Sequence, residues 1–186
     1  MDSSPYRTNI FYYTLYGINR ASLFRENADR EHFLACLKAV KSRSNLHFFA
    51  YSLMEDSIKF LVGSQSGLDL QAMLVRLQKA YTRYYKKKYR WEGTLFSKRP
   101  VSKIMDFEGL FQDWLAEIHN SPVACRLAEN PFDCYSSYRD YILQDDSIVD
   151  GRLLLSFLGE APDKVRAIPR LLGPSFTREG GTGGTN

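Results

Sequence analysis

The chain has 186 residues, a formal net charge of +4 and 25% charged residues. Its hydrophobic content of 44% is typical of a soluble globular protein. This composition excludes globally disordered, collagen-like and fibrous classes, and the length favours one domain with a core of its own.

The first half of the chain predicts a strand, a helix and a hairpin. The aromatic run IFYYTLYG predicts a strand over 10–17. Residues 29–42 place apolar side chains at helical spacing and predict a helix. Two β-prone runs, 46–54 and 58–64, flank turn residues and predict a β-hairpin.

The second half begins with the most regular helical pattern, over 68–90. A short strand is predicted at 100–105. A helix follows over 107–121, capped by Asp106 and ended by Pro122. Three short helical segments and a Gly-rich flexible tail complete the prediction, at 136–143, 150–159, 163–172 and 180–186.

The order of these elements, β-α-β-β-α-β, predicts an α+β fold of the ferredoxin-like split type with an antiparallel sheet. We expect both long helices on one face of the sheet and the other face free to receive a partner. The predicted organisation is a flexible lead, a domain, a C-terminal helical extension and a flexible tail, over residues 1–8, 9–145, 146–173 and 174–186.

No feature of the sequence indicates a membrane or secreted protein. The apolar runs are far shorter than the roughly 18 residues of a membrane span, and the polar start has no signal-peptide core. Three widely spaced cysteines, Cys36, Cys125 and Cys134, form no C-x-x-C pair. We therefore expect a cytoplasmic protein without disulfides or membrane contact.

The positive charge is concentrated in one segment. Ten basic residues and one acid, Glu92, lie between Arg76 and Lys103. This segment has a net charge of +9, so the rest of the chain carries −5. A dense basic patch on an acidic body favours a polyanion site, most often for nucleic acid, although a solvated helix face is the alternative.

Helical spacing places several of these cations on one face of the 68–90 helix, where they could contact phosphates. Aromatic residues are interleaved with them, and Tyr85, Tyr89 or Trp91 could stack on unpaired bases. The candidate nucleic-acid-binding residues are Arg76, Lys79, Arg83, Lys86, Lys87, Arg90, Trp91, Lys98, Arg99 and Lys103.

Five segments of the chain resemble the repeat-associated, single-tyrosine transposases of the HUH nuclease class, in order and at matching spacing. The resemblance covers roughly residues 9–160. The segments are GINRASLFRENADREHFLACL, HFFAYSLM, LQKAYTRYYKKKYRWEGTLFSKR, EIHNSPVACRLAENPFDCYSSYRDYI and LLLSFLG. The family cuts single-stranded DNA near a hairpin, using a His-hydrophobic-His metal site and a helix tyrosine that forms a phosphotyrosine link.

The sequence departs from this family at the positions that its chemistry requires. Ser57 and Lys59 stand where the resemblance implies the two histidine ligands, and Glu117 stands where it implies the nucleophilic tyrosine. Ser121 matches a further polar position. A serine hydroxyl is a poor metal ligand and a lysine ammonium repels a cation. We therefore predict no catalytic residues, no metal and no cofactor.

Two hypotheses for the role of the residues at these positions remain open. Lys59 and Glu117 could form a structural ion pair, because a buried unpaired charge is costly. Alternatively, Asp56, Lys59 and Glu117 could form a new catalytic site. The three histidines, His32, His47 and His119, are not spaced as a metal set.

Three functions are compatible with the sequence. The favoured one is a catalytically inactive, transposase-derived protein that binds hairpin or single-stranded DNA, or RNA, in an accessory or regulatory role. The second is an active strand transferase in which Tyr135, Tyr138 or Tyr141 replaces the lost nucleophile. The third is a protein-interaction module, whose partner would be another protein or a second copy of the chain.

Overall fold

A computed structural model describes residues 8–105, 110–124 and 134–157. The predicted helix at 163–172, the capping role of Asp106 and the Gly-rich tail lie outside these residues. The strands and helices are β1 (Asn9–Tyr16), α1 (Asn27–Lys41), β2 (His47–Leu53), β3 (Ser57–Ser64), α2 (Gly67–Tyr89), β4 (Val101–Ile104), α3 (Leu110–Ala124), α4 (Ser137–Leu143) and α5 (Gly151–Phe157).

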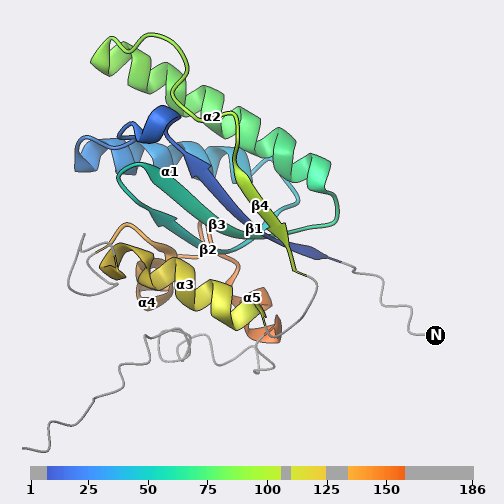
Figure 1. Cartoon of the computed structure of the whole chain (residues 1–186). Helices are drawn as coiled ribbons and strands as arrows, with labels where there is room; N and C mark the ends of the chain where they lie inside the picture. The colour runs from blue at the N-terminus through green and yellow to red at the C-terminus, as the bar shows by residue number, and fades with distance from the viewer. Residues whose placement is uncertain (1–7, 106–109, 125–133, 158–186) are drawn as a thin grey trace, which may run out of the picture.

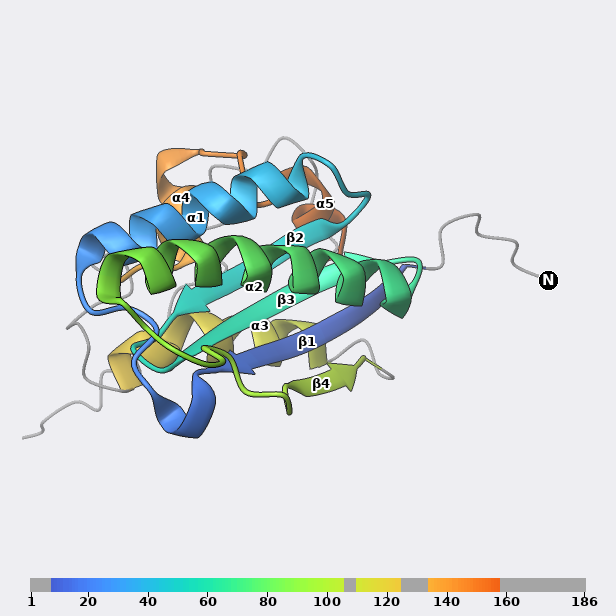
Figure 2. The same ribbon diagram turned by 90° about the horizontal axis from the view of Figure 1, so that it is seen from above.

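The four strands form one antiparallel sheet in the order β2-β3-β1-β4. The two central strands, β1 and β3, pair along their whole length, from Asn9 opposite Ser64 to Tyr16 opposite Ser57. This order follows from the β-α-β-β-α-β succession when each helix connects strands that are not neighbours. The predicted ferredoxin-like fold is confirmed (Figure 2).

Helices α1 and α2 cover one face of the sheet (Figure 1). Their buried side chains recur at helical spacing, as the sequence predicts. Phe33 of α1 and Tyr81 of α2 pack edge to face at 5.1 Å between ring centroids. Side chains buried on α2 are Leu70, Met73, Leu74, Leu77, Tyr81 and Tyr85.

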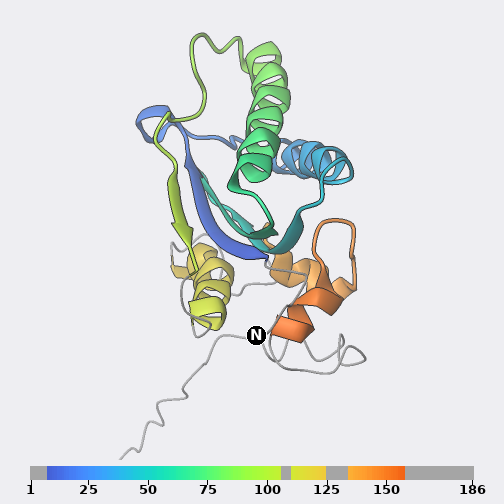
Figure 3. The same ribbon diagram turned by 90° about the vertical axis from the view of Figure 1, so that its right-hand side faces the viewer.

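The opposite face of the sheet is covered by α3, α4 and α5 (Figure 3). Phe111 of α3 packs on Phe49 of β2, and Trp114 packs on Tyr12 of β1. The expectation that this face is free to receive a partner is therefore wrong. The apolar stripe of α3 has to be buried, and the sheet face is the apolar surface available to it.

Residues after α3 satisfy the outer edge of β2. Ser137 Oγ accepts a hydrogen bond from Tyr51 N at 2.9 Å, and Asp150 Oδ2 accepts one from Phe48 N at 2.8 Å. The hydroxyl of Tyr141 donates to the carbonyl of Phe49 at 2.8 Å. These side chains complete the pairing of an edge strand whose backbone groups would otherwise be open.

Helix α3 extends beyond its predicted end. It continues through Pro122 to Ala124, although we expected Pro122 to end it. A proline removes the hydrogen bond of its own nitrogen and crowds the carbonyl four residues earlier, and α3 ends two residues after it. None of the helices in the described ranges is both long enough and apolar enough to cross a bilayer.

Candidate functional site

Four positions that the sequence resemblance singled out, Ser57, Lys59, Glu117 and Ser121, come together between β3 and α3. Ser57 and Lys59 are two residues apart on β3, so their side chains point to the same side of the sheet. Glu117 and Ser121 lie one turn apart on α3. Lys59 Nζ lies 2.9 Å from Glu117 Oε1 and 2.9 Å from Ser121 Oγ. The expected Lys59–Glu117 ion pair is confirmed.

A residue that the sequence analysis missed, Tyr12 of β1, completes this cluster. Its hydroxyl donates to Glu117 Oε1 at 2.7 Å. Burial, reinforced by the bond to Glu117, raises the pKa of Tyr12 to about 12. The pairing of β1 with β3 explains why Tyr12 is here. Thr14 lies opposite Lys59, and Tyr12, two residues from Thr14, points to the same face of the sheet.

The ion pair shifts the pKa of both partners towards their charged forms. For Glu117, burial acts in the opposite direction, but hydrogen bonds from Lys59 and Tyr12 outweigh it and lower the pKa. For Lys59, burial is likewise outweighed by the bonds to Glu117 and Tyr12, which raise the pKa. Both groups are therefore charged at neutral pH.

The cluster lies at one wall of a pocket of about 540 Å³. Arg20 lines this pocket and bonds Asp56 at 3.3 Å, with its guanidinium 4.1 Å from the Tyr16 ring centroid. The candidate catalytic carboxylate Asp56 is therefore paired with Arg20, while Lys59 is paired with Glu117. The structure does not join Asp56, Lys59 and Glu117 into one hydrogen-bonded set.

These residues do not fit a divalent metal ion. Such ions need several oxygen ligands, usually including carboxylates free to coordinate. Here the Lys59 ammonium lies between the oxygens of Glu117 and Ser121. Within residues 8–105, 110–124 and 134–157, no three His, Cys, Asp or Glu side chains meet as a ligand group.

The three histidines lie apart. His32 stacks on Tyr84, with ring centroids 3.8 Å apart. His47 Nδ1 lies 4.0 Å from an oxygen of Asp150. His119 is fully buried, its Nε2 lies 2.7 Å from Ser137 Oγ, and burial lowers its pKa to about 3. His119 is thus a neutral core residue that joins α3 to α4.

We predict that Lys59→Met lowers the free energy of unfolding by about 1 kcal/mol, as for a partly exposed ion pair. Glu117 is 51% exposed and keeps its bond from Tyr12, so water can solvate the carboxylate that the lysine leaves. Urea unfolding at neutral pH measures this loss. The control is Glu117→Gln, which removes the charge of the other partner. A loss above about 3 kcal/mol would instead show that the ion pair behaves as a fully buried one.

The candidate binding cations of α2 and the segment that follows it are all exposed. Among the described residues, none of them makes an ion pair. They are Arg76, Lys79, Arg83, Lys86, Lys87, Arg90, Lys98, Arg99 and Lys103. Lys103 lies apart from the α2 cations, because it pairs in register with Tyr12 and its Nζ lies 5.7 Å from that ring.

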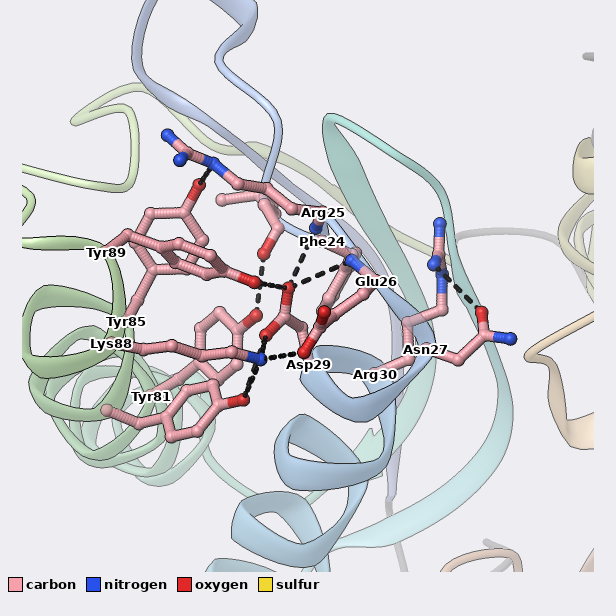
Figure 4. A network of polar contacts seen from close by, with 12 residues as sticks. Phe24, Arg25, Glu26, Asn27, Asp29, Arg30, Tyr81, Tyr85, Lys88 and Tyr89 are labelled. Atoms are coloured by element: carbon pink, nitrogen blue, oxygen red, sulfur yellow. Dashed lines mark hydrogen bonds and ion pairs between the residues drawn. The ribbon is translucent and has the colours of Figure 1, made fainter.

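One cation of the basic segment turns inwards. Lys88 Nζ bonds the buried Asp29 at 2.6 Å and also contacts Glu26 (Figure 4). Its hydrogen bonds to Asp29 and Glu26 raise the pKa of Lys88 although burial opposes this. Lys88 is therefore part of the α1–α2 contact, and the exposed charge is smaller than the net +9 of the segment suggests.

The tyrosines among these cations serve the same contact. Tyr85 is fully buried, so the expectation that it stacks on bases is wrong. Tyr84 and Tyr89 donate to Asp29 at 2.9 and 2.7 Å. The candidate Trp91 is half-buried, packs against Tyr85 and donates to the Thr94 carbonyl at 3.3 Å.

No protein-family model matches the chain, and no curated protein sequence matches it. Solved structures do match. A REP-associated tyrosine transposase bound to a REP hairpin is 12% identical, with a TM-score of 0.63 over 77% of this chain and 87% of that chain. A candidate transposase from Deinococcus radiodurans R1 is 13% identical, with a TM-score of 0.46 over 61% and 91%.

The likeness to the REP-associated transposase concerns the fold. The protein shares the α+β architecture of that transposase, and this is the fold that the sequence resemblance predicted. At 12% identity the likeness does not extend to the chemistry of individual residues. The function therefore has to be argued from the pocket and the basic surface of this chain.

Proposed function

We propose that the protein binds hairpin or single-stranded nucleic acid, DNA or RNA, and does not cut it. Its role would be accessory or regulatory. The observation that carries this proposal is the row of exposed α2 cations that make no ion pair within the described part of the chain. Clustered cations without protein partners attract a polyanion and release its counterions on binding.

The shared fold supports this proposal. The structure with a TM-score of 0.63 is a transposase bound to a hairpin. A chain with the same fold and a strongly basic helix is suited to a similar class of ligand. The fold alone does not assign function, so the charge distribution remains the main argument.

The pocket supports the absence of cutting. Metal-assisted phosphoryl transfer needs a divalent ion to polarise the phosphate. Lys59 and Glu117 neutralise each other there, and the nearby Tyr12 hydroxyl is held in its protonated form by its raised pKa. A protonated phenol is a weak nucleophile.

The alternative nucleophiles differ in access. Tyr141 is 2% exposed and its hydroxyl is engaged by the Phe49 carbonyl, so it is not available for attack. Tyr135 and Tyr138 are half-buried. A strand transferase using either of them would leave a covalent protein–DNA adduct, which makes this alternative testable.

We predict salt-sensitive binding. Fluorescence anisotropy with labelled single-stranded, hairpin and duplex DNA, and with RNA, should give micromolar or tighter binding at low salt to at least one of these ligands. Neutralising several phosphates should make the logarithm of affinity fall with the logarithm of salt at a slope of about −2 or steeper. A flat salt response, or no binding at micromolar protein, would contradict the proposal.

The same ligands test the absence of cutting. With magnesium or manganese present, we expect neither cleavage of labelled hairpin or single-stranded DNA nor a covalent adduct on denaturing gels. Divalent-dependent cleavage that Glu117→Ala abolishes would restore the enzyme hypothesis. Binding without cleavage by both the wild-type protein and the Glu117→Ala variant would agree with the proposal.

A further inference from the structure

A groove of about 590 Å³ runs between α2 and the segment that follows it. Figure 1 shows this segment leaving the end of α2 and returning beside the helix towards β4. The groove has one wall of helix and one wall of loop. Val75, Lys79, Arg83 and Lys86 lie in the helix wall, and Leu95 and Phe96 lie in the loop wall.

The helix wall carries three of the exposed cations, Lys79, Arg83 and Lys86. They are four and three residues apart, so they follow one another along one side of α2. The rise of about 1.5 Å per residue spreads them over two turns. The other candidate binding cations on α2 or at its C-cap, Arg76, Lys87 and Arg90, do not line the groove.

The floor of the groove is apolar. Leu95 and Phe96 are almost fully buried, and Val75 is 42% exposed. An apolar floor beneath a row of cations matches the two parts of an unpaired nucleotide, whose base presents a flat apolar face and whose phosphate is an anion. In a duplex the base faces are stacked on one another, so they are not free to contact this apolar surface.

The loop wall is held in place by the strand end next to it. Ile18 N donates to the Leu95 carbonyl at 2.8 Å, and Ser97 N donates to the Tyr16 carbonyl at 2.8 Å. Trp91 Nε1 donates to the Thr94 carbonyl. The groove is therefore formed before a ligand arrives, which reduces the entropy cost of binding.

We propose that this groove binds a run of unpaired nucleotides. Its phosphates bond to Lys79, Arg83 and Lys86, and a base packs over the exposed side chain of Val75. The proposal rests on the proposed nucleic-acid-binding function and assigns the part of the ligand that this surface takes. A hairpin would enter by its loop or by a single-stranded flank.

Filling the groove tests the proposal without changing charge. Val75→Trp occupies the groove, and Leu68→Trp places the same ring at a 76% exposed position of α2 outside it. The probe is a fluorescein-labelled oligo(dT) of about 20 nucleotides, longer than the 4–16 nucleotides that a single-strand site usually covers. We expect Val75→Trp to weaken binding at least tenfold and Leu68→Trp to change it less than twofold.

A matched pair of charge variants gives an independent test. The groove variant carries Lys79→Gln, Arg83→Gln and Lys86→Gln, and the control carries Arg76→Gln, Lys87→Gln and Arg90→Gln. The groove variant should reduce the steepness of the salt dependence by about 2, the value for three single-strand phosphates, and the control by less. Thermal melting confirms that each variant is folded.

The outcomes separate this proposal from the proposed function. Suppose that the wild-type protein binds the oligonucleotide, both triple variants lose affinity equally and Val75→Trp binds as tightly as wild type. The groove proposal is then wrong, while the proposed nucleic-acid binding still holds. If a duplex of equal length binds as tightly as oligo(dT) and loses as much affinity in the groove variant, the groove does not select unpaired nucleotides. If the wild-type protein binds none of these probes, the proposed function itself fails.

Discussion

Replacing Asp29 with alanine is expected to lower the free energy of unfolding by about 3–5 kcal/mol, the cost of breaking a buried charge network from one side. The Asp29 carboxylate is completely buried and accepts from five donors. Two are the backbone N–H groups of Arg25 and Glu26, at 2.8 and 3.1 Å. The others are the side chains of Tyr84, Lys88 and Tyr89.

The loss is large because these donors come from two parts of the chain, the residues that lead into α1 and the last turns of α2. The start of α1 and the last turns of α2 both lose their common acceptor, and Lys88 keeps its ion pair with Glu26 and its hydrogen bond to the Tyr84 hydroxyl. For a chain of this size about 1 kcal/mol lowers the melting temperature by roughly 2–4 °C, so a drop near 10 °C is expected. Calorimetry or urea unfolding measures it.

Asp69→Ala provides a matched control. Asp69 occupies the same third position of α2 that Asp29 occupies in α1, but it is exposed. Its removal should cost less than about 1 kcal/mol, the usual effect of a first-turn acid on the helix dipole. Equal losses in the two variants would mean that Asp29 acts only as a helix-terminal charge.

The same carboxylate predicts a pH dependence. Burial favours the neutral form, but the bonds from Lys88, Tyr89, Tyr84 and the Arg25 N–H outweigh it and lower the pKa of Asp29 from 3.8 to about 2. A lowered pKa adds stability that is complete above the unfolded value and is lost as the pH falls through the folded one. The stability gap between wild type and Asp29→Ala should therefore narrow as the pH falls from about 4 to about 2.

Replacing Gly17 with alanine is expected to lower the free energy of unfolding by about 2–4 kcal/mol, within the range of overpacked or strained sites. A Cβ at Gly17 would lie 2.0 Å from the Ala21 carbonyl oxygen, which is a backbone atom. The φ of −61° at Gly17 suits any residue, so the cost is steric. Urea unfolding of the variant measures it.

The clash would displace a turn that carries several contacts. Gly17 N donates to the Asp56 carbonyl, Ile18 N to the Leu95 carbonyl and Leu23 N to the Glu55 carbonyl. The Ile18–Leu95 bond also fixes the loop wall of the groove. We therefore expect Gly17→Ala to weaken oligo(dT) binding as well as stability, by loosening this wall.

Gly67→Ala is the control for this prediction. At Gly67 a Cβ would lie 3.6 Å from the Phe11 ring, an ordinary contact, and alanine is the better helix former. Its stability should be unchanged or slightly higher. If Gly17→Ala were as stable as wild type, the turn at 18–21 would have to yield freely, and its hydrogen bonds would contribute little.

Residue spacing alone predicted the central part of the fold. The period-two and helical patterns identified four strands and the two long helices in the right order, and short connections between them left one arrangement. The Lys59–Glu117 pair was also predictable, because two opposite charges at matching positions of one site are costly to bury apart. Tyr12 was missed, since its bond to Glu117 depends on the register between β1 and β3.

Sequence patterns did not determine the use of the second sheet face or the direction of the side chains around Asp29. The apolar stripe of α3 identifies a face to be buried, but several apolar surfaces could satisfy it. Similarly, the run of Lys86, Lys87 and Lys88 near the end of α2 does not itself show which of these side chains turns inwards.

The sequence by itself determined the fold and the concentration of positive charge on one helix. Only the tertiary structure decided which of those charges remain available to a ligand, which tyrosines are buried and where a groove forms. The reason is physical: spacing along a helix fixes which side chains share a face, whereas the partner of each side chain is set by contacts such as Asp29 with Lys88, 59 residues apart in the chain.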